Sequence, residues 1–169
     1  MGLLAKGFLV VVLFVIFLTM LQFSMLRAFA YSGPSGGAGR EMAYCMLFDC
    51  YKVAYPTDAN ITPPSYEIGF DAGPEDLGFG EIPIGSNSKR FIELEGEEVS
   101  RIIMTSSGNI SEYIHFSPAS LLLDDGEKAE VRAELRTEPD MKESVYTGTI
   151  SVARITPRHS LLRFMLGWL

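Results

Sequence analysis

The chain has 169 residues, of which 47% are hydrophobic and 21% charged, and its formal net charge is −7. This composition excludes a disordered polar chain, which would contain too few apolar residues to fold. The acidic balance argues against nucleic-acid binding, which needs a basic surface. Charge and hydropathy divide the chain into four regions, residues 1–30, 31–65, 66–153 and 154–169.

The first region contains a segment long enough to cross a membrane. Residues 7–26 form a run of 20 residues without a charged side chain. An α-helix of this length spans about 30 Å, the thickness of the hydrocarbon core of a bilayer. The positive charges on the two sides, Lys6 before the run and Arg27 and Arg40 after it, do not define an orientation. Because the region before the run is short and the middle of the chain is acidic, we expect a single-pass protein of the cell membrane with its folded domain extracytoplasmic.

Three interpretations of the N-terminal helix remain open. In the first it is retained as a signal-anchor. In the second it is a secretory signal cleaved after Ala30, because Ala28-Phe29-Ala30 has the small-x-small pattern, although the apolar run exceeds the 7–15 residues usual for a signal peptide. In the third it is cleaved after Gly7, because Lys6-Gly7-Phe8 resembles the prepilin-peptidase site of type IV pilins and archaeal surface-filament subunits. Those subunits carry glutamate five residues into the mature chain, where this chain has Val12.

The second region, residues 31–65, is interpreted as a linker with an apolar centre. Residues 32–39 are rich in glycine and serine and are typical of a flexible tether. Residues 42–55 are rich in aromatic and apolar side chains and contain Cys45 and Cys50. These cysteines would close a small disulfide loop in an oxidising compartment, or remain two thiols. Their spacing matches neither a zinc site nor a C-x-x-C redox motif.

The third region, residues 66–153, is predicted to be an all-β domain. Residues 128–136 alternate strictly, with Ala129, Val131, Ala133 and Leu135 on one face and charged side chains on the other. A helix would also suit these residue types, but it would leave Val131 and Leu135 almost alone on their stripe. Turn signals separate further strand-like runs, and together they favour an antiparallel sandwich of about seven strands. Strands are expected at 90–95, 99–105, 128–136 and 146–152, and turns at 85–88, 106–109, 124–126 and 138–140.

Several of these segments resemble an immunoglobulin-like sandwich of the major-sperm-protein and ASH-like sort. The segment Leu77-Gly-Phe-Gly-Glu-Ile-Pro-Ile-Gly85 is similar to the opening of such domains, and Tyr146-Thr-Gly-Thr-Ile-Ser-Val152 to their closing strand. Residues 114–118 and 121–135 follow in the same order, whereas Leu94-Glu95-Gly96 departs from the usual Leu-x-Asn. The resemblance implies an immunoglobulin-like antiparallel sandwich preceded by one N-terminal transmembrane helix. Such domains mostly bind or build, and similar single-span proteins occur among archaeal surface proteins.

No combination of residues indicates catalysis. His115 is expected to be a packing residue in a strand, and His159 has no partner that sequence identifies. The chain lacks the nucleophile elbow and the phosphate loop. Asp124-Asp125-Gly126 lacks the alternating ligands of a calcium loop and is better explained as a turn. We therefore expect a non-enzyme with no cofactor, no metal site and no small-molecule substrate. Asn60 and Asn109 begin glycosylation sequons and are expected in loops.

The fourth region, residues 154–169, is a basic and apolar tail. A short amphipathic helix is expected after Pro157. With residues 42–55 it supplies apolar side chains outside the sandwich pattern, and we expect the two segments to pack on each other or on the membrane, or to dock a partner. The candidate interface residues are Met46, Leu47, Phe48, Leu161, Leu162, Phe164 and Trp168.

The sequence therefore predicts a membrane-anchored structural or adhesive module that contacts a protein partner or other copies of itself. The alternative is a subunit of a pilus-like filament or secretion system, assembled through the N-terminal helix. A ligand receptor or enzyme is the third interpretation.

Overall fold

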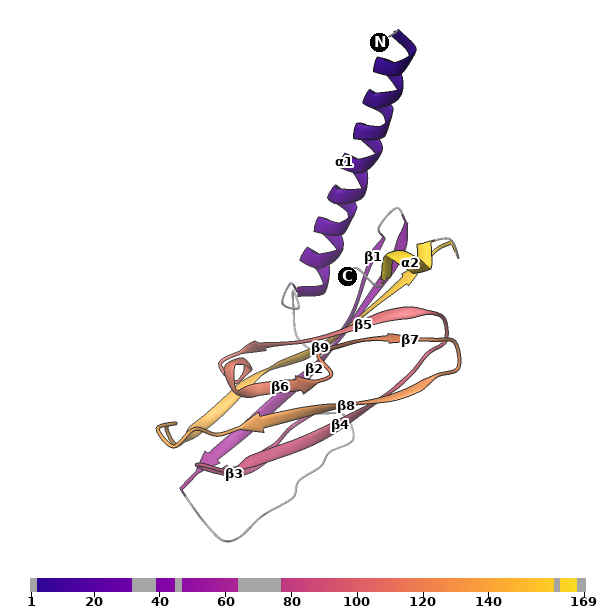
Figure 1. Cartoon of the computed structure of the whole chain (residues 1–169). Coiled ribbons are helices and arrows are strands. Elements are labelled where there is room, and N and C mark those ends of the chain that lie inside the picture. The colour runs from indigo at the N-terminus through magenta and orange to yellow at the C-terminus, as the bar shows by residue number, and fades with distance from the viewer. Residues whose placement is uncertain (1–2, 32–38, 45–46, 64–76, 160–161, 167–169) are drawn as a thin grey trace.

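In the computed structural model the described residues are 3–31, 39–44, 47–63, 77–159 and 162–166. They form one long helix, nine strands packed as two sheets, and two short helical turns (Figure 1). The elements in chain order are α1 (Leu3–Tyr31), β1 (Gly39–Tyr44), β2 (Phe48–Thr62), β3 (Gly80–Pro83), β4 (Asn87–Glu95), β5 (Ser100–Gly108), η1 (Ser111–Tyr113), β6 (Ile114–Ser117), β7 (Ser120–Leu123), β8 (Lys128–Arg136), β9 (Ser144–Pro157) and α2 (Arg163–Leu166).

Helix α1 extends away from the sandwich, as Figure 1 shows. Its segment Val10–Phe29 is long and apolar enough to cross a membrane, and little of it is buried within the chain. Large apolar side chains are exposed along this segment, for example Val10 at 65% and Met20 at 69%. The polar Thr19 is satisfied inside the helix, because its hydroxyl donates to the carbonyl oxygen of Ile16 at 2.7 Å. An apolar surface of this kind is what a lipid environment accommodates.

The strands form a mostly antiparallel sandwich. The larger sheet has the order β1-β2-β9-β5-β7, and β3 joins it by pairing in parallel with the far end of β2. The smaller sheet has the order β4-β8-β6. Antiparallel β2 and β9 form the longest ladder, from Phe48–Pro157 to Ile61–Ser144. The predicted all-β fold with an N-terminal apolar helix is therefore confirmed, apart from the one parallel pair.

The core between the sheets follows the predicted alternation. In β8, Val131, Ala133 and Leu135 are fully buried and Ala129 is half-buried, so the strand and its inward face are confirmed. In β9 the inward residues include Ile150 and Val152, both also expected to be buried. Opposite strands with side chains of period two build a two-layer core in this way.

The interpretation of residues 31–65 as a linker is wrong for β1 and β2. Strand β2 runs through this region and lies between β1 and β9 in the larger sheet. Its Pro56 is compatible with an interior strand, because the Pro56 carbonyl accepts a hydrogen bond from the Leu77 N–H and so faces away from β9. The nitrogen of Pro56 points to the same side as its carbonyl, so its missing N–H removes no hydrogen bond between β2 and β9. The predicted end of the domain at residue 153 is also too early, since β9 continues to Pro157.

Glycines shape two kinds of position. Gly85 and Gly126 adopt positive φ values of 80° and 73° in the turns before β4 and β8. The turn expected at 106–109 begins later, because Ser106–Gly108 still belong to β5. Gly148 of β9 crosses β5 so closely that an added Cβ would collide with the carbonyl oxygen of Ser107. This crossing brings β5 and β9 together at the end of the sheet remote from α1.

Candidate functional site

The outer face of the larger sheet carries a second apolar cluster where α1 meets the sandwich. We call it the junction cluster; its buried members are Leu26, Phe48, Cys50, Ile103, Ala153, Ile155 and Leu166. They come from α1, from strands β2, β5 and β9, and from α2. Half-buried side chains of α1, among them Phe23 and Phe29, pack against it. The final turns of the apolar helix therefore lie directly on the sheet.

Lys52 provides a polar contact in the same place. This β2 residue is fully buried, and its Nζ donates to the carbonyl oxygen of Phe29 at 2.8 Å. The same Nζ lies 5.3 Å from the centroid of the Phe29 ring. Because α1 ends at Tyr31, the Phe29 carbonyl is among the last four, which have no partner within a helix. A cation at this end is also favoured by the helix dipole and by the aromatic face.

The segment after β9 closes the cluster from the other side. The guanidinium of Arg158 donates to Oδ1 of Asp49 through Nε at 3.0 Å and through a terminal nitrogen at 2.9 Å. The Arg158 N–H also donates to the carbonyl oxygen of Leu47 at 3.1 Å. Further along the chain, Leu162 packs against the junction cluster and Leu166 is one of its buried members. Figure 1 shows α2 near the lower end of α1 and the β1–β2 hairpin.

The predicted interface residues are thus found partly within the chain's own interior. Leu47, Phe48 and Leu162 contribute to the junction cluster, and Phe48 is fully buried. Phe164 belongs to α2. The other predicted interface residues, Met46, Leu161 and Trp168, lie outside the described residues.

Cys50 is also part of this cluster, at 1% exposure, and is in register with Ala43 of β1 and Ile155 of β9. Its expected disulfide partner, Cys45, lies outside the described residues. The Cys45–Cys50 disulfide therefore remains a prediction.

A groove of about 660 Å³ opens on the inner face of the larger sheet, where the end of β4 faces β2 and β9. Its floor includes Tyr51, Tyr55 and Val152. The acidic residues at its border are Asp49, Glu93, Glu95, Glu97 and Glu98. Arg154 crosses the groove, donating to the carbonyl oxygen of Glu95 at 2.7 Å and lying 3.7 Å from the Glu97 carboxylate. In the part of the chain that the structure describes, no group of three or more potential ligands is placed to hold a metal ion.

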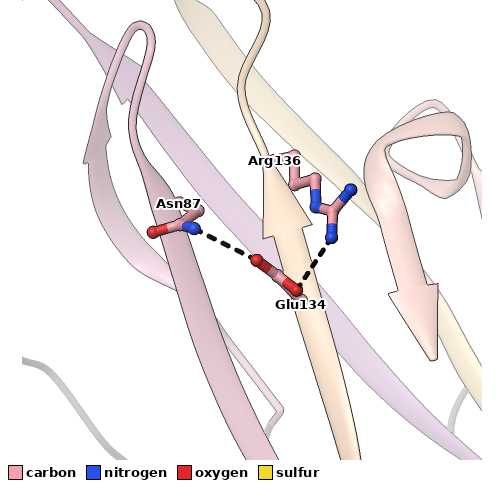
Figure 2. Close-up of polar contacts among 3 residues, drawn as sticks. All are labelled: Asn87, Glu134 and Arg136. Atoms are coloured by element: carbon pink, nitrogen blue, oxygen red, sulfur yellow. Dashed lines mark hydrogen bonds and ion pairs between the residues drawn. The ribbon is translucent and has the colours of Figure 1, made fainter. Parts of the chain in front are cut away.

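Glu134 occupies the outer face of the smaller sheet, as Figure 2 shows. Its carboxylate accepts hydrogen bonds from Asn87 at 3.1 Å and from Arg136 at 3.2 Å. The hydrogen bond from Arg136 is the main cause that lowers the pKa of Glu134, and nearby Lys89 contributes. The sequence correctly places Glu134 on the outward face, but the residue is only 8% exposed, because its neighbours cover it.

The remaining sequence candidates lie apart from one another. His115 is exposed in β6, in register with Glu134. Asn60 is a half-buried residue of β2, so its expected loop position is wrong, whereas Asn109 lies exposed in the turn after β5 and accepts a bond from the Thr147 N–H at 2.7 Å. Asp124 begins a turn in which its N–H donates to the carboxylate of Glu127 at 2.8 Å.

No family model matches the chain, and no curated protein matches its sequence. Two packed sheets and an N-terminal apolar helix are what the structure itself shows.

Sequence analysis did not identify the polar residues of the junction. Lys52 is the single charged side chain between Asp49 and Pro56, in a segment that otherwise consists of aromatic and small apolar residues. A lysine in such a segment is a signal for a buried cation with a specific acceptor. The Asp49–Arg158 contact joins positions 109 residues apart and left no local signal.

Proposed function

We propose that this chain is a membrane-anchored, extracytoplasmic β-sandwich that serves as a structural or adhesive module and makes protein–protein contacts. The observation that carries the proposal is the packing of the last turns of α1 against the larger sheet, through the junction cluster and the hydrogen bond of Lys52. A domain that only needs to be near a membrane does not need to pack against its anchor helix, because a flexible tether is enough. A domain that presents a binding surface in a fixed orientation does benefit from such packing, since less orientational freedom is lost on binding.

The resemblance to immunoglobulin-like domains of the major-sperm-protein and ASH-like sort supports the same function. Members of that sort mostly bind or build, and single-span examples occur among archaeal surface proteins. We place this chain among such proteins as part of the proposal. The sandwich offers polar outer strands and an acidic groove, both suited to contacts with other proteins.

The first experiment tests the location of the sandwich. Val145 is 55% exposed on β9, so a cysteine in its place should react with a membrane-impermeant maleimide in intact cells. The parent protein gives the background from its own cysteines. Labelling of Val145→Cys that appears only after lysis would show that the sandwich lies on the inner side.

The second experiment tests whether the junction cluster fixes the orientation of α1 relative to the sandwich. Spin labels at Met20 and Val145, both exposed, should give a narrow distance distribution in the full chain in lipid nanodiscs. Leu26→Ser removes a fully buried contact of the junction cluster and should broaden that distribution. Met25→Ser makes a comparable change at the adjacent position, where the side chain is 56% exposed, and should leave it narrow. If both variants behave like the parent, the junction cluster does not orient the domain.

The filament subunit is the second candidate, and one observation favours it. The helix is covered by its own sandwich only near its end, whereas its apolar side chains from Val10 to Leu21 are exposed, apart from a half-buried Thr19. Such a surface would also suit packing among the helices of other copies. The mass of the purified protein separates the two candidates: an intact Met1 supports the anchor, and a chain that begins at Phe8 supports the filament.

A further inference from the structure

Strand β4 forms an edge of the smaller sheet. It pairs with β8 over nine positions, from Asn87–Arg136 to Glu95–Lys128, and no other described strand pairs with it. An edge strand presents a row of backbone N–H and C=O groups to any other strand that approaches it. The other edge strands, β1, β3, β6 and β7, are shorter, with six, four, four and four residues. Strand β4 is therefore the longest edge in the described chain.

The outward face of β4 has an unusual order of side chains. Its exposed residues are Asn87, Lys89, Phe91, Glu93 and Glu95. Phe91, at the middle of the strand, is a large apolar side chain that is 56% exposed. A positive charge lies two residues before it and a negative charge two residues after it, so the strand carries opposite charges at equal distances from a central aromatic ring.

This order is complementary to itself. When two copies of β4 pair antiparallel about a two-fold axis at Phe91, the two Phe91 rings face each other. Each Lys89 then lies opposite Glu93 of the other strand, which gives two pairs of opposite charge. Side chains directly opposite each other on one face of an antiparallel pair are in contact, and both aromatic pairs and opposite charges stabilise such pairs. A two-fold axis also makes the contact self-limiting, because each edge is used once.

The monomer contains a reason to accept this partner. On β8, the residue in register with Glu93 is Glu130, so two carboxylates lie side by side on the same face. Like charges directly opposite each other destabilise a strand pair. A lysine from a second β4 would reach Glu93 from its other side and offset that repulsion.

We propose that β4 is the site at which two copies of this chain associate, by antiparallel pairing about Phe91 into one continuous sheet. The inference rests on the proposed function, because it names the partner of the protein–protein contact. The register is specific: a pair centred on Ile92 would place Phe91 against Glu93 and lose the aromatic contact. The charges on the edge oppose pairing with strands of other sequence, which is how natural edge strands avoid aggregation.

The experiment uses the full chain in detergent, with its molar mass measured by light scattering over a range of concentrations. The parent should have the mass of two chains plus detergent. Glu93→Lys sets Lys89 against a second lysine and should raise the dissociation constant at least tenfold. The double variant Lys89→Glu/Glu93→Lys exchanges the charges and should restore the dimer. Glu143→Lys, the same change of charge at an exposed position before β9, is the control and should leave the dimer intact.

A cross-link tests the register. Phe91→Cys should form a disulfide between two copies under mild oxidation, visible as a reducible dimer beyond the parent background. A monomeric parent, a dimer that Glu93→Lys leaves unchanged, or a Phe91→Cys variant that does not cross-link would each overturn the proposal. These failures are distinct from failure of the proposed function, which the maleimide labelling and the spin-label distances test without any dimer.

Discussion

Leu135 offers the sharpest test of the sandwich core. This residue of β8 is fully buried between the two sheets, among the side chains of the main core. The change Leu135→Ala removes about three carbon atoms from the core, which at ~0.8 kcal/mol per buried methylene is a loss of roughly 2.4 kcal/mol. The cavity left in a close-packed interior adds to this loss, so the free energy of unfolding should fall by about 2–5 kcal/mol.

The measurement is thermal unfolding of the full chain in detergent, followed by circular dichroism. For a chain of this size each kcal/mol lowers the melting temperature by roughly 2–4 °C. A loss near 3 kcal/mol therefore predicts a decrease of about 6–12 °C for Leu135→Ala. Reversibility should be checked first, because an irreversible transition reports a rate.

Leu122 provides the matched control. It is a leucine on β7 that is 46% exposed, so Leu122→Ala makes the same chemical change without opening an interior cavity. Its melting temperature should stay within about 2 °C of the parent, as expected for a surface substitution within ±0.5 kcal/mol. If the two variants melt together, Leu135 does not face the core, and the register of β8 against β4 is wrong.

Three further predictions concern single groups. The pKa of Glu134 is lowered, mainly by the hydrogen bond from Arg136, so its contribution to stability is present above its unfolded pKa and is lost as pH falls through its folded pKa. Melting temperatures between pH 7 and 3 should therefore fall less steeply for Glu134→Gln than for the parent, and equal slopes would contradict this. Burial raises the pKa of Tyr113, so the contribution of its neutral phenol to the stability of the fold is lost as pH rises through its folded pKa. Subtracting the alkaline absorbance titration of Tyr113→Phe from that of the parent should reveal a phenol that ionises at higher pH than free tyrosine. Gly148→Ala should lower the melting temperature by several degrees, since the new methyl group meets the backbone of Ser107, and an unchanged value would show that the β5–β9 crossing can open.

Local pattern was sufficient for most of the sandwich. Strand β8 is a regular alternation of apolar and charged residues, and both its type and its buried face follow from that period. The glycines at 85 and 126 mark turns because only glycine adopts positive φ at little cost. The apolar helix was equally clear, since its composition allows few other structures.

Strand β2 was missed because its environment changes along its length. From Phe48 to Ala54 alternate residues face the junction with the helix, while from Tyr55 to Ile61 the other set faces the main core. No single face is apolar throughout, so no period of two emerges. Lys52 and Pro56 further suggest a loop, although both are accommodated by partners distant in sequence.

The near burial of Glu134 could not be predicted for a related reason. Its coverage depends on the register between β4 and β8, which brings Asn87 and Lys89 beside it. The charged face of a strand was predictable, but which of its charges would be covered was decided by the neighbouring strand.

The long β2–β9 ladder also sets the order in which the protein completes its fold during synthesis. Its paired residues are separated by 83 residues at Ile61–Ser144 and by 109 at Phe48–Pro157. At about 5–20 residues per second, β2 leaves the ribosome roughly 4–22 s before its partner exists. Throughout that interval the apolar helix is available for membrane insertion, while β2 can pair only with the neighbouring β1 and, at its far end, with the short β3. The proline and the charged Lys52 and Asp58 within β2 make it a poor template for other nascent chains, and so protect it until β9 arrives.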